Sequence, residues 1–212
     1  MSTVTALPMP PPRLALLAEL SQPSSPLWIQ HTTRQVTSIF QAYTAVTQLP
    51  PPATTSFTSP PSLSRSPTPS CATLPPLIPF VQYLVSVCQI TNASLLYATV
   101  YTRRLHARLP AGALSKPGAV HRIFVGALLL AHKYVEDAAT LTPRKIANTL
   151  MRWPALSSAW SRIALGGPAT RQALWWAYPA EIARIERAFL KLMDFQLYVS
   201  EEDMAEFLPE ES

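Results

Sequence analysis

The sequence predicts an all-α domain that follows a proline-rich segment. Apolar residues in the second part of the chain recur at helical spacing, and no segment alternates apolar and polar side chains as a half-buried strand does. The clearest stretch, residues 121–137, is apolar without a break from Ile123 to Ala131. A helix that is apolar all round lies at the centre of a domain. Because this run is far shorter than the ~20 residues of a membrane span, we expect no membrane partner.

The composition changes abruptly along the chain, and this change predicts two parts. Residues 1–79 hold 16 of the 23 prolines, a single Glu and no Lys or Asp, whereas all remaining acidic residues lie beyond them. Such a segment buries too little apolar surface to offset its ordering entropy. We therefore expect residues 1–73 to be a largely disordered tail whose removal leaves the melting temperature nearly unchanged. Residues 74–208 are then the folded domain.

Five helices are expected in series. The first spans Phe80–Thr91, and Asn92 is a suitable N-cap for a second helix over Ala93–Leu109. The third is the central stretch, residues 121–137, in which Ala127 is mid-helix. Replacing Ala127 by Glu should therefore unfold the domain, because an unpaired carboxylate is very costly to bury.

The last two helices start at recognisable signals. Thr142 followed by Pro143 begins the fourth, which runs to about Trp153, and Pro179 begins the fifth. An irregular insertion of about residues 154–178 separates them. Ser200, which is followed by three acidic residues, resembles a capped start of a further short helix.

The charge pattern does not favour nucleic acid as a partner. Residues 80–212 carry a net charge of only +3, from 14 basic and 11 acidic residues of mixed order. The densest basic group is at the end of the second helix and comprises Arg103, Arg104, His106 and Arg108. Cations at a helix C-terminus are also favourable with the helix dipole, so this group is either a local feature or a binding patch, and we favour the first.

No motif indicates an enzyme. The chain shows no nucleophile–base pair, no Gly-rich phosphate loop and no metal-ligand spacing among its two Cys and four His. We expect no cofactor, no metal and no small-molecule substrate. In the tail, Ser66 and Thr68 of "RSPTPS" are candidate phosphosites for a proline-directed kinase, although Ser/Thr-Pro pairs are as frequent there as chance predicts.

Four stretches taken together resemble the fungal PCL-type and phosphate-system cyclins. They cover about Leu74 to Glu206 and read "LPPLIPFVQYLVSVCQIT", "LLYATVYTRRLHARLP", "HRIFVGALLLAHKYVED" and "EIARIERAFLKLMDFQLYVSEEDM". The resemblance implies a single five-helix cyclin box with proline-rich flanks. The insertion of residues 154–178 is longer than such cyclins usually have, and the chain has no room for a second five-helix repeat.

The resemblance also implies a site. Cyclins contact their kinase through a Lys at the end of the third helix and a Glu in the fifth, which here are Lys133 and Glu186. The neighbouring apolar positions carried over in the same way are Tyr134, Leu190, Phe195 and Leu197. For Glu186 the alternative is a solvated helix charge, and for the apolar residues it is core packing.

The function that this resemblance implies is regulatory. A cyclin does no chemistry itself but docks on a cyclin-dependent serine/threonine kinase and fixes the helix whose Glu pairs with the ATP-positioning Lys. Such a subunit would work in the nucleus or the cytoplasm, in the cell cycle or in phosphate metabolism. The alternatives are a cyclin-fold adaptor for transcription factors or nucleic acid, and a truncated cyclin copy.

Overall fold

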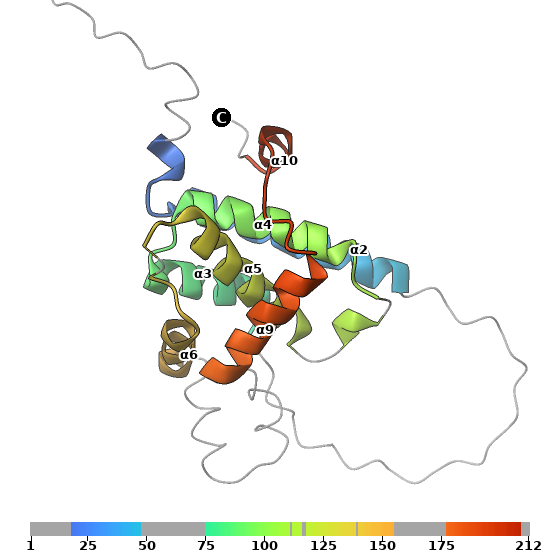
Figure 1. Cartoon of the computed structure of the whole chain (residues 1–212). Coiled ribbons are helices and arrows are strands. Elements are labelled where there is room, and N and C mark those ends of the chain that lie inside the picture. The colour runs from blue at the N-terminus through green and yellow to red at the C-terminus, as the bar shows by residue number, and fades with distance from the viewer. Residues whose placement is uncertain are drawn as a thin grey trace, which may run out of the picture.

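The computed structural model describes residues 18–47, 75–110, 112–115, 118–138, 140–154 and 177–208, and of residues 42–47 the backbone only. These residues form helices joined by short turns (Figure 1), and the described ranges contain no β-strand. The all-α class is confirmed. The five expected helices are present in the expected order: α3 (Leu77–Cys88), α4 (Asn92–His106), α5 (Ala119–Val135), α6 (Pro143–Arg152) and α9 (Pro179–Leu192).

Helix α5 lies at the centre, as its sequence predicts. It packs against α4 on one side and α9 on another, and it also contacts α3. All residues from Phe124 to His132 are buried. Gly126 allows α9 to approach closely, because a Cβ added there would lie only 2.9 Å from Cδ2 of Phe189.

The helix starts follow the expected capping signals, with one exception. The Thr142 hydroxyl accepts a hydrogen bond from the backbone N–H of Lys145, and Ser200 forms a capping box with Asp203 at the start of α10 (Glu201–Ala205). The cap of α4 is Thr91 rather than Asn92, since the Thr91 hydroxyl accepts from the N–H of Ser94. Asn92 is instead buried, and its side-chain amide donates to the carbonyl of Glu19 at 2.9 Å.

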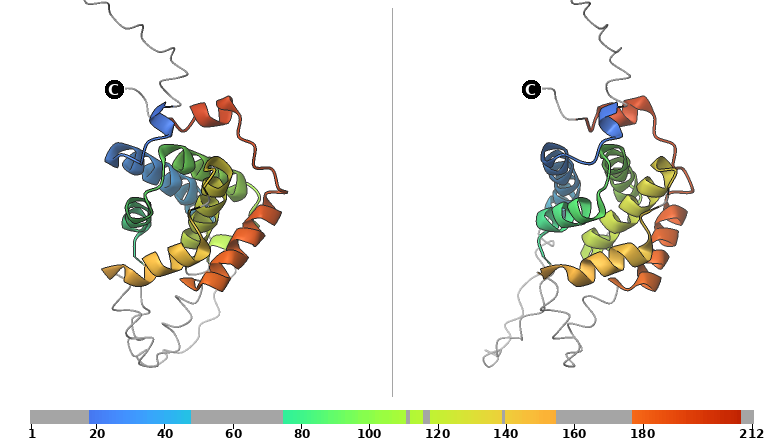
Figure 2. Two further views of the ribbon diagram at one scale, coloured as in Figure 1. Left: turned by 60° about the vertical axis from the view of Figure 1, so that its left-hand side comes forward. Right: turned by 90° about the vertical axis from the view of Figure 1, so that its left-hand side faces the viewer.

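The expectation of a disordered tail over residues 1–73 is wrong for residues 18–47. Helix α2 (Pro26–Thr47) packs along α4 and α3 (Figure 2), and it buries Trp28, Ile29, Val36 and Phe40. The physical reason is that the apolar residues of α2 recur at helical spacing and form one apolar face. The high Ser, Thr and Pro content of residues 1–79 as a whole obscures this pattern. The rest of residues 1–73, including Ser66 and Thr68, lies outside the described residues.

The buried face of α2 also contains Thr32 and Thr33. The Thr33 hydroxyl donates to the carbonyl of Ile29, one helical turn earlier. This bond satisfies the hydroxyl inside the helix, so it can be buried without a tertiary partner. At the N-terminal end of α2, the indole Nε1 of Trp28 donates to Glu19 Oε1 at 2.7 Å. The removal of residues 1–72 is therefore expected to destabilise the domain, in contrast to the expectation from composition.

The segment after α9 runs back along α4 and is tied to it by ion pairs. Arg108 pairs with Asp194 at 3.1 Å, and Arg104 pairs with Asp203 at 2.8 Å. A third pair joins Arg103 to Glu206, and the Arg103 guanidinium also lies over the ring of Phe207. These contacts place residues 194–208 beside α4.

Candidate functional site

The structure brings the two predicted charged residues together. Lys133 lies in the last turn of α5 and Glu186 lies in the middle of α9, and the Lys133 Nζ is 2.5 Å from Glu186 Oε1. The lysine side chain is 38% exposed and the glutamate side chain 14%. Glu186 is thus no freely solvated helix charge, and it holds the ammonium group at the rim of the core. An ammonium group has three donors, so this pair leaves the others for solvent or a partner.

Aromatic side chains adjoin the pair on the α4 side. Tyr134, which follows Lys133, is 45% exposed, and its ring centroid lies 5.8 Å from that of Tyr97 on α4. Tyr97 in turn makes an edge-to-face contact with the buried Tyr101. Burial raises the pKa of both Tyr97 and Tyr101, so both phenols are neutral at physiological pH.

The turn that ends α9 presents a further aromatic ring. Asp194 and Phe195 both adopt positive φ values, 51° and 58°, and the N–H of Phe195 donates to the carbonyl of Leu190. This turn directs the ring of Phe195 outward, and the residue is 66% exposed. Leu190 is half-buried and packs against the core, which is the alternative considered for it from the sequence.

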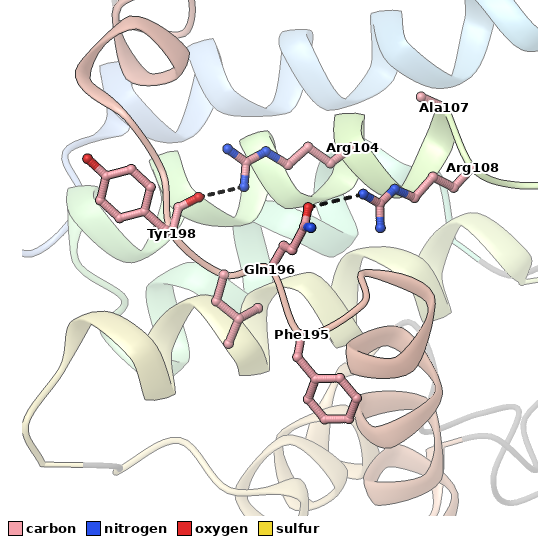
Figure 3. Close-up of a pocket in the computed structure, with 7 residues that line it drawn as sticks. Arg104, Ala107, Arg108, Phe195, Gln196 and Tyr198 are labelled. Carbon is pink, nitrogen blue, oxygen red and sulfur yellow. Dashed lines mark hydrogen bonds between the residues drawn. The ribbon is translucent and has the colours of Figure 1, made fainter.

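Two side chains of α4 fix the extended segment that follows the turn. The Tyr101 hydroxyl donates to the carbonyl of Leu197 at 2.6 Å. Arg104 donates to the carbonyl of Tyr198 at 2.7 Å (Figure 3). Leu197 is half-buried against the core, whereas Tyr198 is 73% exposed. The segment and the end of α4 enclose a hollow of about 600 Å³.

The name α5–α9 surface is used here for the site residues of α5, of α9 and of the segment that follows α9, together with Tyr97 of α4, whose ring contacts that of Tyr134. They are Lys133, Tyr134, Glu186, Phe195, Leu197 and Tyr198. Sequence reasoning missed Tyr97 and Tyr198. The spacing of Tyr97 and Tyr101, one helical turn apart on α4, is the signal that could have found the first. The exposure of Tyr198 depends on the turn at Asp194, which the sequence alone does not reveal.

The basic group at the end of α4 is a local feature in the described part of the chain. Its guanidinium groups pair with carboxylates of the C-terminal segment, as described above. The ring of His106 makes an edge contact with Phe40 of α2 at 6.2 Å. A binding patch for nucleic acid at this position would have to break those pairs first.

The described residues contain neither a cluster of metal ligands nor a helix that could span a membrane. No three His, Cys, Asp or Glu side chains of those ranges gather as metal ligands would. None of the helices formed by those residues is both long enough and apolar enough to cross a bilayer. Most of the predicted insertion, residues 155–176, lies outside the described ranges.

The sequence was also compared with known proteins. PHO85 cyclin-1 of Saccharomyces cerevisiae is 28% identical to the chain over 131 residues. The chain is similar to a yeast cyclin. The aligned part covers 62% of this chain and 38% of the yeast protein, so the chain matches well under half of that relative's length. No protein-family model matches the chain, and no solved structure matches it significantly.

Proposed function

We propose that the chain is a PCL-type cyclin, a regulatory subunit that binds and activates a cyclin-dependent serine/threonine kinase. Two independent features support this proposal. One is the similarity to a protein named a cyclin. The other is the α5–α9 surface, where the Lys133–Glu186 pair stands among exposed aromatic rings.

The Lys133–Glu186 pair is the observation that carries the proposal. A pair held at the meeting point of two rigid helices is preorganised, so a partner can hydrogen-bond to it with little ordering cost. The kinase helix that a cyclin fixes would meet the unused ammonium donors of Lys133 and the carboxylate of Glu186. Such a contact would position the kinase's own Lys–Glu pair for ATP, and no group of this chain would take part in the chemistry.

The exposed rings supply the apolar part of the same interface. Tyr134, next to Lys133 in α5, and Phe195, in the turn that ends α9, are both exposed, and large aromatic side chains are frequent energetic centres of protein interfaces. Leu190 and Leu197 are half-buried against the core, so they would touch the partner only at their edges.

Co-purification from native extract tests the proposal. The full chain should retain a cyclin-dependent kinase and raise its activity on a protein substrate. Lys133→Ala and Glu186→Ala should each weaken retention and activation strongly, since losing one partner of a desolvated charge contact costs about 2–5 kcal/mol. Arg187→Ala and Lys191→Ala, exposed positions of the same helix α9, are the matched controls and should behave like the parent. Retention of the kinase by the Ala variants at parental levels would contradict the proposed interface.

A further inference from the structure

A second hollow lies between α3 and α6, away from the α5–α9 surface. It measures about 440 Å³ and shares no lining residue with that surface. Helix α6 lies below α3 in both views of Figure 2, and the two helices are in contact. We call this hollow the α3–α6 groove.

The wall formed by α6 is strongly basic. Arg144 and Arg152 lie two helical turns apart and both are exposed, and Lys145 lies between them at the groove. Their spacing puts the two guanidinium groups on one face of the helix. Within the described residues, none of the three has a carboxylate at ion-pair distance, in contrast to the arginines of α4.

The wall formed by α3 is uncharged and partly apolar. Helix α3 contains no charged residue, and Val87 is 50% exposed although the helical spacing places it with core residues. The ring of Tyr83 is held in place, because it stacks on Trp153 at 5.0 Å and its hydroxyl donates to the carbonyl of Thr149. The groove thus combines three cations with an apolar wall on a rigid base.

No described carboxylate of the chain lines the groove. The nearest in sequence is Asp137, which is exposed and is not a lining residue, and Glu136 before it is bound by the hydroxyls of Thr91 and Ser94 at the start of α4. The flanking sequences 48–74 and 155–176 contain no Asp or Glu at all. Three clustered cations without partners repel each other, so an anionic ligand from another molecule fits the site.

We propose that the α3–α6 groove binds an extended acidic segment of a second protein. The acidic side chains would pair with Arg144, Lys145 and Arg152, and an apolar side chain of the same segment would lie on Val87 and Tyr83. The geometry favours a peptide over nucleic acid, because one face of the Tyr83 ring is already covered by Trp153 and no other aromatic ring lines the groove for bases to stack on. The proposal is independent of the kinase-binding role.

Fluorescence anisotropy with the full chain tests this proposal. The probe is a fluorescein-labelled peptide rich in Asp and Glu with a central Leu, and its Asn/Gln counterpart is the uncharged control. We expect the acidic probe to bind and the counterpart not to bind. The double variant Arg144→Gln/Arg152→Gln should weaken binding about tenfold, as expected for two exposed charge pairs. Val87→Glu should weaken it as well, since it places a carboxylate in the groove.

A second double variant makes the result decisive. Arg187→Gln/Lys191→Gln removes the same charge from exposed positions of α9 and should change probe affinity less than about twofold. Thermal melts confirm that every variant is folded. Equal losses in the two double variants would overturn the proposal, because binding would then follow net charge alone. Absence of probe binding at low salt, or tighter groove-dependent binding of a single-stranded oligonucleotide than of the acidic peptide, would overturn it too.

Discussion

Helices α2 and α5 are both buried, but they are buried by different means. Helix α5 is surrounded by other helices, and its buried residues from Phe124 to Ala131 are all apolar. Helix α2 lies on the outside of α3 and α4 and buries a single face, part of which is made of Thr32 and Thr33. The comparison shows that a domain can have a central helix without which no core exists, and an outer helix that adds a layer to an existing core.

The largest effect should come from a charge in the central helix. Ala127 has no exposed surface, and its helix packs against both α4 and α9. Ala127→Glu should therefore unfold the domain, since an unpaired buried carboxylate costs several kcal/mol against a total stability of about 5–15 kcal/mol. Circular dichroism with a denaturant titration checks this. A variant that unfolds cooperatively at the parental midpoint would show that α5 is not central.

A smaller effect is expected from truncation in the outer helix. Phe40 of α2 is 6% exposed, and Phe40→Ala should cost about 3 kcal/mol, at the low end of such core truncations because α2 packs on one side only. The control is Leu27→Ala in the same helix, where the side chain is 76% exposed and little should change. Equal melting temperatures for Phe40→Ala and the parent would mean that α2 does not pack on the domain in solution.

The contribution of helix α5 to stability should depend on pH. Helix α5 carries His121 and His132, and burial lowers the pKa of both below the ordinary 6.5. The unfolded chain then takes up protons below about pH 6.5 that the folded chain resists, so stability is full above that pH and falls as the pH drops toward the lowered folded-state values.

Thermal melts between pH 7.5 and pH 5 measure this response. His132→Gln keeps a polar group near Thr140, the present partner of the imidazole Nε2, and removes one titrating group. Its melting temperature should fall less steeply with decreasing pH than that of the parent. Parallel curves for the variant and the parent would show that His132 does not resist protonation in the folded protein.

The smallest effect on stability is expected from the ion pair between α5 and α9. Lys133 is more than one-third exposed, so Lys133→Ala should cost less than about 1 kcal/mol in the free energy of unfolding. Urea titration measures it. A cost of several kcal/mol would indicate that the pair mainly serves the fold rather than a partner.

Much of the fold can be predicted from the sequence, because the central helix and the helix starts have strong local signals. The unbroken apolar run predicts α5, and Thr142–Pro143 and Ser200 predict two helix starts. A short, weak helix over residues 34–47 is all that the sequence indicates for α2, and its packing on the domain was not predicted, because its threonines count as polar. The Thr33 hydroxyl is nevertheless suitable for burial, since it donates to the preceding turn. Helical spacing alone also does not show that Val87 is half-exposed, since it does not reveal where a neighbouring helix ends.

The candidate site was predictable only in part. The resemblance to a cyclin family named Lys133 and Glu186, and the structure joins them in one ion pair. The ring of Phe195 owes its exposure to a turn with two positive φ values, and Tyr198 owes its position to hydrogen bonds from α4. Such long-range contacts have no local sequence signal, so their consequences for the surface appear only in the folded chain.

The exchange variant Lys133→Glu/Glu186→Lys tests the central claim most directly, with thermal melts and kinase co-purification measured side by side. It keeps an ion pair between α5 and α9 but reverses the charges that a partner would meet. If the α5–α9 surface binds a cyclin-dependent kinase, the exchange variant should melt near the parental temperature and still fail to retain the kinase. Parental kinase retention and activation by the exchange variant would contradict the account, because the pair would then act only within the chain.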